Sequence, residues 1–175
     1  DVVASRRSLM HTLETCLIGY FEQDASRPDF RRIVTPSRKL TGDNSDAIYF
    51  DAPVSGDHAY AIHGSMHGAA YFSLTIEEGA DDGKMATNTA GVINDEQLEI
   101  DSNGHVTLYL GGRPRDKNWL ALPPGASRVT TRHYFEQASC AAKDPDMEPR
   151  IRIDCLTAKD IPAPPNDASV AAGIR

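Results

Sequence analysis

Cysteine is scarce in this sequence, and its few copies form no recognisable pattern. The three cysteines are Cys16, Cys140 and Cys155, and none has the Cys-x-x-Cys or Cys/His spacing of a zinc site. Because the count is odd, one cysteine is left unpaired in any disulfide pairing. Cys140 and Cys155 could lie close together on adjacent segments. Cys16 is predicted to be a buried helix residue. These features favour a reducing, cytoplasmic setting.

Long apolar runs are missing as well. A membrane-spanning helix needs about 18 consecutive apolar residues, and the sequence has no such run, so no membrane span is predicted. The first residues also lack the basic, apolar and cleavage regions of a secretory signal. The chain begins at Asp1 rather than at methionine and ends inside a helix-like pattern over 167–175. We therefore expect the natural protein to continue beyond it.

The charge balance argues against nucleic acid as a partner. The formal net charge is -7, and the 18 lysines and arginines are scattered along the chain rather than gathered in one segment. Glycine-rich phosphate loops are absent, and residues 64–68, Gly-Ser-Met-His-Gly, lack the spacing of a nucleophile elbow. The sequence therefore predicts no nucleotide cofactor and no serine-hydrolase motif.

Short strand-like segments make up most of the chain. They are rich in β-branched and aromatic residues and are separated by Gly, Pro, Asn and Ser turns at intervals of about ten residues. The predicted strands cover 30–35, 47–52, 58–63, 70–77, 97–101, 105–110, 129–135 and 150–156. Asn103-Gly104 is predicted to form a hairpin turn. This pattern predicts an all-β fold, an antiparallel β-sandwich with a flanking helix.

The flanking helix is predicted over residues 5–21, with Ser5 as its N-cap. Its apolar side chains share one helical face: Leu9, Leu13, Cys16, Leu17 and Tyr20. This face needs a partner, either a sheet of the sandwich or a further domain. The expected organisation is a helix and linker over 1–27, a β-sandwich domain over 28–158, and a Pro-rich linker with the start of a second helix over 159–175.

Five short motifs carry a resemblance to a known family. In order they are Asp43-Asn44, Asp46-Ala-Ile-Tyr49, Tyr60-Ala-Ile-His63-Gly64, Asn118-Trp119-Leu120 and Arg132-His-Tyr134-Phe. Together they resemble the bacterial family called domain of unknown function twelve-fourteen. The resemblance implies a jelly-roll β-sandwich within a larger protein, so the expected partner is the remainder of that protein or a second β-domain. It implies no reaction.

A first candidate site contains three histidines, His58, His63 and His67. Cupin-type jelly rolls bind iron or manganese through histidines on strands, and His63 with His67 could supply two ligands for Fe, Mn or Zn across a turn. His58 and His63 are separated by an odd number of residues, so one strand would point them to opposite faces. The alternative is that the three imidazoles are independent and the protein holds no cofactor.

A second candidate site combines an arginine with aromatic residues. Arg132 and Tyr134 share a strand face, and we group with them Tyr49, Asn118 and Trp119. Such a set can clamp a carboxylate or hold a sugar by stacking and hydrogen bonding. In the alternative, Arg132 pairs with a buried carboxylate of Asp43 or Asp46 and Trp119 belongs to the core.

Three functions are compatible with these features. The leading hypothesis is a bacterial module that binds a small molecule, such as a carbohydrate or carboxylate, or that assembles with the rest of a longer protein. The alternative is a catalytic domain, hydrolytic or metal-dependent, that uses the region of His58, His63 and His67 or the Arg132 face. A purely structural role predicts exposed apolar surface and self-association as a homo-oligomer.

Overall fold

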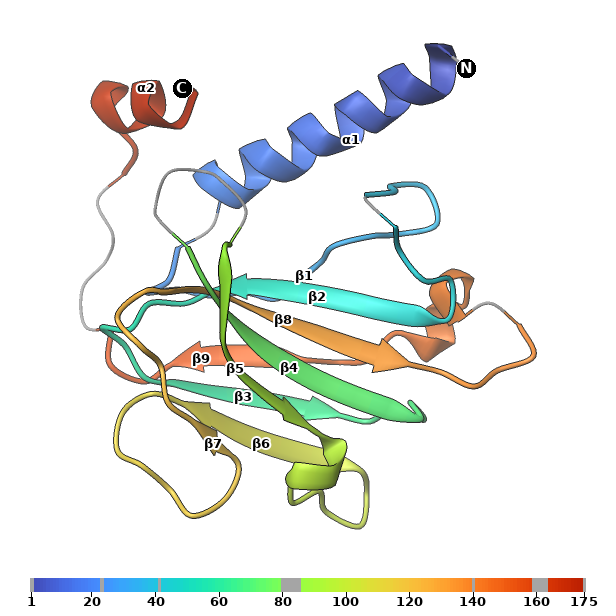
Figure 1. Ribbon diagram of the computed structural model, residues 1–175, viewed down its shortest axis with the longest axis vertical. Coiled ribbons are helices and arrows are strands. Elements are labelled where there is room, and N and C mark those ends of the chain that lie inside the picture. Colours follow the sequence, from blue (N-terminus) through green and yellow to red (C-terminus); the bar gives the residue numbers. More distant parts are fainter. Residues whose placement is uncertain are drawn as a thin grey trace.

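Two β-sheets stacked face to face form the centre of the molecule. The computed structural model describes residues 2–22, 24–40, 42–79, 86–139, 141–158 and 164–174. Helices α1 (Val2–Phe21) and α2 (Asp167–Ile174) lie outside the two sheets (Figure 1). The predicted all-β fold with a flanking helix is confirmed. Among the described helices, none is both long enough and apolar enough to cross a membrane.

The first sheet has five strands in the order β1-β2-β8-β4-β5, and all its pairs are antiparallel. Its strands are β1 (Arg31–Arg32), β2 (Ala47–Pro53), β4 (Tyr71–Glu78), β5 (Asn88–Asn94) and β8 (Ala126–Tyr134). The central strand β8 is the segment that the sequence predicts over 129–135. Its β-branched and aromatic residues suit a strand that is paired on both edges.

The second sheet has four strands in the order β7-β6-β3-β9. Its strands are β3 (Tyr60–Ser65), β6 (His105–Leu110), β7 (Trp119–Leu120) and β9 (Arg152–Cys155). The short pair β6 and β7 is parallel, whereas the other pairs are antiparallel. The sandwich is therefore as predicted, but this strand order does not establish jelly-roll connectivity.

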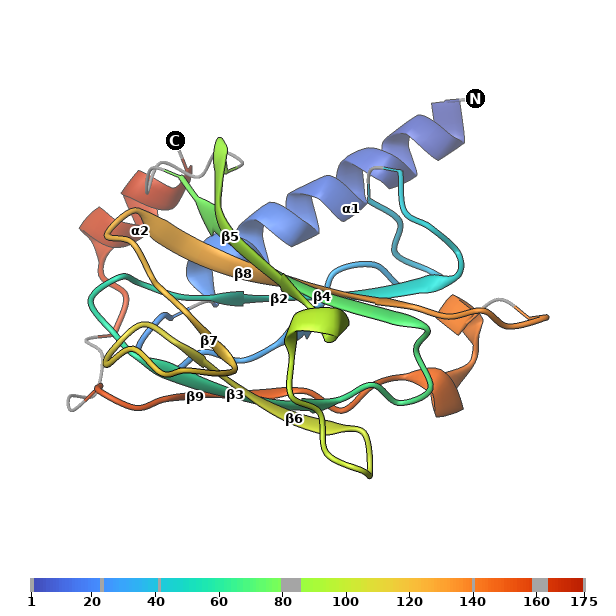
Figure 2. The same ribbon diagram turned by 60° about the horizontal axis from the view of Figure 1, so that its bottom comes forward.

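The core fills the space between the two sheets (Figure 2). On β4, the alternation of apolar residues predicts that Phe72, Leu74 and Ile76 share the core face, and all three are buried. Leu108 on β6 and Ile62 on β3 reach the same cluster from the second sheet. Most apolar side chains point inward, so the outer faces are largely polar, with Tyr71 and Val92 as exposed exceptions on the five-stranded sheet.

One strand prediction in the middle of the chain is wrong, because 97–101 is not a strand and the 3-10 helix η1 (Asp95–Gln97) occupies its start. The physical reason is local capping, in which the Asn94 backbone N–H donates to Oε1 of Gln97 at 3.1 Å. Strands β5 and β7 were not predicted. Two more 3-10 helices, η2 (Ala141–Lys143) and η3 (Pro145–Met147), lie before β9.

The Asn-Gly turn before β6 is present, but the predicted hairpin is wrong, because β6 pairs with β3 and β7 and not with 97–101. Gly104 has a φ of 78°, and Asp101 Oδ1 accepts the backbone N–H of Asn103 and of His105, each at 2.8 Å. A side chain in this left-handed conformation is strained by about 1–2 kcal/mol. We expect Gly104→Ala to lower the free energy of unfolding by that amount, as measured by urea denaturation.

Gly42→Ala is the matched control for this prediction. A methyl group at Gly42 would meet none of the described residues within 4 Å. The control should change stability by less than about 0.5 kcal/mol. Equal effects of the two substitutions would contradict the assignment of strain to Gly104.

Helix α1 differs from its prediction in two respects. It begins at Val2, so Ser5 lies inside the helix and is not its N-cap. The predicted buried face is wrong, because Leu9, Leu13, Cys16 and Leu17 are exposed to solvent. The Tyr20 side chain lies outside the part of the structure that is described. Apolar periodicity identified residues that share a face, but it did not identify the face that docks.

The docking face of α1 is polar. Arg7 donates to the Ser37 carbonyl at 2.9 Å, and His11 Nδ1 accepts the backbone N–H of Lys39 at 3.1 Å. One turn further, Glu14 pairs with Arg38 at 3.1 Å. These contacts hold α1 on the outside of the five-stranded sheet (Figure 2). The apolar side chains of Leu9, Leu13 and Leu17 are exposed to solvent.

The C-terminal predictions are partly testable. The predicted second helix is confirmed as α2. Residues 159–163 of the predicted Pro-rich linker, and Cys140, lie outside the described residues, so the proximity of Cys140 to Cys155 stays a prediction. Cys155 itself is a free, half-buried cysteine.

Candidate functional site

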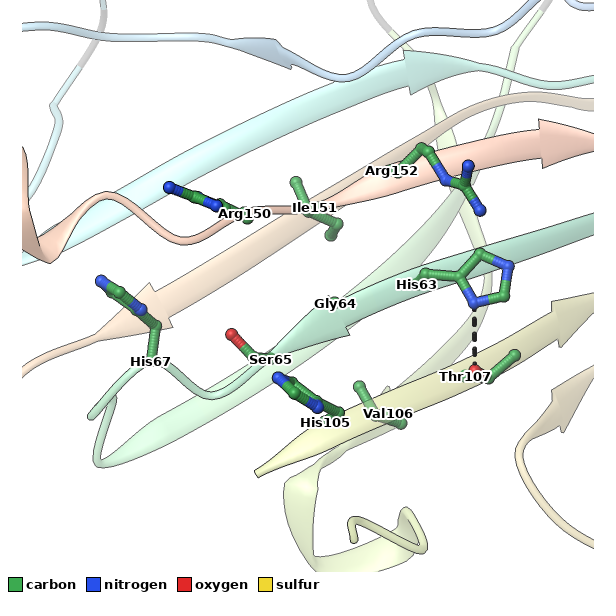
Figure 3. Close-up of a pocket in the computed structure, with 10 residues that line it drawn as sticks. All are labelled: His63, Gly64, Ser65, His67, His105, Val106, Thr107, Arg150, Ile151 and Arg152. Carbon is green, nitrogen blue, oxygen red and sulfur yellow. Dashed lines mark hydrogen bonds between the residues drawn. The ribbon is translucent and has the colours of Figure 1, made fainter. Parts of the chain in front are cut away.

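An open groove of about 590 Å³ crosses the outer face of the four-stranded sheet (Figure 3). Strands β3 and β6 line it together with the segment that leads into β9. The lining residues are His63, Gly64, Ser65, His67, His105, Val106, Thr107, Arg150, Ile151 and Arg152. Most of the polar side chains among them carry or can accept a positive charge.

The alternation of each strand explains why these polar side chains point outward. On β3, Ile62 is buried in the core, so the next residue, His63, faces the groove. The sheet register places His63 opposite Thr107 on β6 and opposite Arg152 on β9. Three strands that lie far apart in the sequence thus contribute one row of side chains across the groove.

This row is connected by polar contacts. His63 Nδ1 lies 3.1 Å from the Thr107 hydroxyl, and His63 Nε2 lies 3.5 Å from a carboxylate oxygen of Asp154. The same Asp154 oxygen pairs with Arg152 at 2.9 Å. The charge of Arg152 is therefore already partnered, and this end of the groove is close to electrically balanced.

The opposite end of the groove contains the guanidinium of Arg150, whereas His105 at this end lies 3.8 Å from a carboxylate oxygen of Asp101. Arg150 makes no hydrogen bond or ion pair with any residue in the described ranges. Around it lie Ser65, His67 and His105 (Figure 3). His67 has a left-handed φ of 47°, and its Nε2 donates to the Asp146 carbonyl at 2.7 Å, which fixes the ring at the rim.

The floor between the two ends is apolar. A methyl group on Gly64 would lie 3.5 Å from Ile151, at ordinary van der Waals distance. Ile151 packs against the core, and Val106 is buried on the other side. The groove thus combines an apolar floor with hydrogen-bonding groups along both sides, which is the usual composition of a small-molecule site.

Only two of the three histidines of the first candidate site line the groove. His63 and His67 line the same groove, whereas His58 lies outside it and its Nδ1 is 3.2 Å from the Thr157 hydroxyl. Among the described residues, no three His, Cys, Asp or Glu side chains are grouped so that they could hold a metal ion. Binding of Fe, Mn or Zn by His63 and His67 stays a prediction.

The second predicted site is divided between the two sheets. Tyr49, Arg132 and Tyr134 lie together on the outer face of the five-stranded sheet, where the rings of Tyr49 and Tyr134 are 6.2 Å apart. Arg132 Nη1 donates to the Thr75 hydroxyl at 3.1 Å. Burial and a side-chain hydrogen bond with Tyr134 raise the pKa of Tyr49 to about 12.

Asn118 and Trp119 lie at the edge of the other sheet. The Asn118 side chain bridges the backbone of Glu99, accepting from its N–H at 2.8 Å and donating to its carbonyl at 2.9 Å. Trp119 Nε1 donates to the Gly111 carbonyl at 2.8 Å. Both contacts hold loops in place, so the five residues of the predicted constellation do not form one site.

The expected carboxylate partner of Arg132 is also different from the prediction. Asp43 pairs with Lys39 at 2.7 Å, and among the described residues neither Asp43 nor Asp46 pairs with Arg132. The register explains this, because Tyr49 lies opposite Arg132, whereas Asp46 lies beside Phe135, whose backbone N–H donates to the Asp46 carbonyl at 2.9 Å.

Sequence reasoning selected only His63 and His67 among the residues that line the groove. The polar lining residues that it missed are Ser65, His105, Thr107, Arg150 and Arg152. A signal was present, since the predicted strands over 105–110 and 150–156 each place polar residues on one alternating face. That signal could not show that these two strands flank β3.

Comparisons with known proteins identify the family. A model of the family described as "Protein of unknown function (DUF1214)" matches residues 45–138, more than half of the chain. The resemblance that the short motifs indicate is therefore confirmed. Among curated proteins, none matches this chain.

Solved structures add a longer relative. The crystal structure of an uncharacterised protein from Burkholderia cenocepacia matches with a TM-score of 0.80 and 26% identity, over 98% of this chain and 47% of that one. The chain thus spans about half the length of this relative. The VPA0106 protein from Vibrio parahaemolyticus has a TM-score of 0.43 and 21% identity over 75% of this chain and 31% of that one, which is too low for an argument.

Proposed function

The chain belongs to the DUF1214 family of proteins of unknown function, and for this member we propose the binding of a small carboxylate-bearing molecule, such as an acidic sugar, in the groove. The observation that carries the proposal is the Arg150 end of the groove. There a guanidinium group without a protein acceptor among the described residues lines the same groove as the Ser65 hydroxyl and the imidazoles of His67 and His105.

The chemistry of this end fits a carboxylate. An arginine presents its N–H groups as a planar fork that matches the two oxygens of a carboxylate. Arg152 is a weaker candidate, because Asp154 already accepts from it. The carboxylate is therefore assigned to Arg150, and hydroxyl groups of the same ligand are assigned to the row of His63 and Thr107.

The dimensions of the groove limit the size of the ligand. A volume of about 590 Å³ lies within the range of small-molecule sites. The groove is open on its outer side, so the ligand stays partly in contact with water. A monosaccharide acid would contact the floor formed by Gly64 and Ile151 and reach polar groups at both ends.

Titration calorimetry with glucuronate, glucose and propionate tests this proposal. We expect glucuronate to bind more tightly than propionate, because it adds hydroxyl groups, and glucose to bind more weakly, because it lacks the carboxylate. Arg150→Gln should raise the dissociation constant for glucuronate by at least about tenfold, since hydrogen bonds to a charged group are worth about 1.5–3 kcal/mol.

Arg113→Gln is the matched control, because it removes the same charge from an exposed loop outside the groove. It should leave the affinity unchanged. Equal affinities for glucose and glucuronate, or equal losses in the two arginine variants, would contradict carboxylate binding at Arg150. Failure of all three compounds to bind would exclude this ligand class from the groove.

A further inference from the structure

The outer face of the four-stranded sheet continues past one end of the groove. Antiparallel pairing places His63 opposite Thr107 at that end. Two residues further along each strand, Ala61 lies opposite Tyr109. Because side chains alternate along a strand, Tyr109 points to the same outer face as Thr107. In Figure 3, β3 and β6 extend beyond His63 and Thr107 and away from Arg150, so a further stretch of the same face follows the groove.

This further stretch carries a second arginine. The guanidinium carbon of Arg115 lies over the ring of Tyr109, 3.5 Å from its centroid. Such a contact is a cation–π interaction, and it occupies the flat face of the guanidinium rather than the N–H groups at its edge. Within the part of the chain that the structure describes, Arg115 has no hydrogen-bond acceptor and no ion-pair partner. Its N–H groups are therefore available to an anion.

The two unpaired arginines lie at opposite ends of one face. Arg150 precedes β9, and continuation of the β3–β9 register brings it opposite Ser65. Arg115 lies over Tyr109, which pairs with Ala61. Ser65 and Ala61 are four residues apart on β3, which corresponds to about 14 Å along an antiparallel strand. A ligand that contacts both guanidinium groups must therefore extend along the strands.

The surface between the two arginines is suited to hydroxyl groups. His63 and Thr107, which lie 3.1 Å apart, present an imidazole and a hydroxyl there. The carboxylate of Asp154, which lies opposite Ala61, is paired with Arg152 at 2.9 Å, so its charge is balanced. A ligand with a negative charge at each end and hydroxyl groups between them matches this order of groups.

An acidic peptide fits this face less well than a sugar. Peptides that bind to sheets commonly pair their backbone with the free edge of a strand. Here β3 is paired with β6 and β9, and β6 is paired with β3 and β7, so both strands lie inside the sheet. A ligand above them meets side chains and no free strand edge, which favours recognition through hydroxyl groups and carboxylates.

We propose that this face binds an acidic oligosaccharide, a short chain of uronic acids that extends along β3 and β6 from Arg150 to Arg115. The proposal rests on the carboxylate binding proposed for Arg150, and it adds a second carboxylate subsite at Arg115. Ring hydroxyls between the two ends contact His63 and Thr107. Because the first contact holds the second carboxylate close to Arg115, the second contact forms within the complex and adds to the affinity.

Titration calorimetry with galacturonate and its linear oligomers up to the tetramer tests the second subsite. We expect the tetramer to bind at least about tenfold more tightly than the monomer, because it gains a second charged hydrogen-bonding contact. Arg115→Gln should remove most of this gain and leave the affinity for the monomer unchanged. Arg150→Gln should weaken the binding of both, since it removes the subsite that they share.

Arg113→Gln is the matched control, because Arg113 lies in the same loop and has the same charge, whereas Arg115 is the residue over Tyr109. It should leave the affinity for the tetramer unchanged, and circular dichroism confirms that each variant is folded. Equal affinities for monomer and tetramer, or equal losses in the Arg113 and Arg115 variants, would overturn the second subsite while monomer binding at Arg150 stands. Tetraglutamate that binds as tightly as the tetramer would overturn the proposal in favour of an acidic peptide. Failure of every galacturonate compound to bind the wild type would overturn both this proposal and carboxylate binding at Arg150.

Discussion

Asp51→Ala is expected to lower the free energy of unfolding by about 3–5 kcal/mol. Asp51 lies on β2, its side chain is 1% exposed, and two arginines surround it. Arg31 donates to both carboxylate oxygens, from Nε at 3.2 Å and from Nη2 at 3.1 Å. Arg128 lies 3.5 Å away on β8. Removal of the carboxylate leaves two cations close together without their shared partner.

The location of this ion cluster makes the effect larger than that of a surface pair. Helix α1 passes directly over it, because a methyl group on Gly19 would come within 3.8 Å of Arg128 and 3.9 Å of Arg31. Arg31 also donates to the Thr15 carbonyl of α1 at 3.5 Å. We therefore expect Asp51→Ala to loosen α1 as well as to destabilise the sheet.

Urea denaturation measures the change, and Glu14→Ala is its control. Glu14 also pairs with an arginine, Arg38, but 47% of its side chain is exposed, so its loss should cost less than about 1 kcal/mol. If Asp51→Ala cost no more than Glu14→Ala, burial of the carboxylate would not be the source of its contribution. Faster proteolysis within α1 in the Asp51 variant alone would support the loosening of the helix.

The α1 docking shows where sequence reasoning fails on this protein. The helical spacing of Leu13 and Leu17 was recognised, and the helix itself was found. The prediction that this face is buried was wrong. Helical periodicity shows which residues share one face of the helix, but it does not show which face packs against the rest of the protein. The polar contacts made by Arg7 and His11 depend on a loop near residues 37–39 whose position follows from the tertiary fold.

The strands of the sandwich could be predicted better than the docking of α1, because the alternation of apolar and polar residues shows directly which face of a strand is buried. On β4 the alternation identified the core face, and on β8 the β-branched run identified a central strand. Strand pairing was not predictable, since it brings together segments that are far apart in the sequence. For the same reason the sequence identified His63 and His67 but could not add Arg150, which lies on a segment that joins β3 only in the folded sheet.

The candidate Arg132 site failed for a related reason. Alternation correctly placed Arg132 and Tyr134 on one face of β8, and register brought Tyr49 beside them. Asn118 and Trp119 were grouped with them because they precede the strand in the chain. The turn after Leu120 carries the chain from one sheet to the other. Strand β7, with Trp119, therefore belongs to the four-stranded sheet, whereas β8, with Arg132, belongs to the five-stranded sheet.

Acidification is expected to destabilise the protein through one core histidine. His133 on β8 is 1% exposed and packs against the rings of Phe72 and Phe50, at centroid distances of 4.8 and 6.1 Å. Burial lowers the pKa of His133 to about 4, although a hydrogen bond with the Ser65 backbone opposes the shift. Its Nδ1 has no hydrogen-bond partner among the described residues, so the core offers nothing that would stabilise a second proton.

The sign of the effect follows from proton binding in the two states. Between about pH 6.5 and the lowered value near 4, the imidazole of the unfolded chain binds a proton that the folded protein excludes. Stability contributed by neutral His133 is therefore complete above about pH 7 and decreases as the pH falls. The full shift corresponds to about 3 kcal/mol, of which about 2 kcal/mol is lost between pH 7.5 and pH 5.

Urea denaturation of the wild type and of His133→Gln at both pH values isolates this contribution. Carboxylates titrate in both proteins, so their effects cancel in the difference, and the variant should lose about 2 kcal/mol less than the wild type on acidification. An unaltered pH dependence in His133→Gln would mean that the folded core accommodates the charged imidazole, and the unpaired Nδ1 would then have to gain an acceptor such as a buried water.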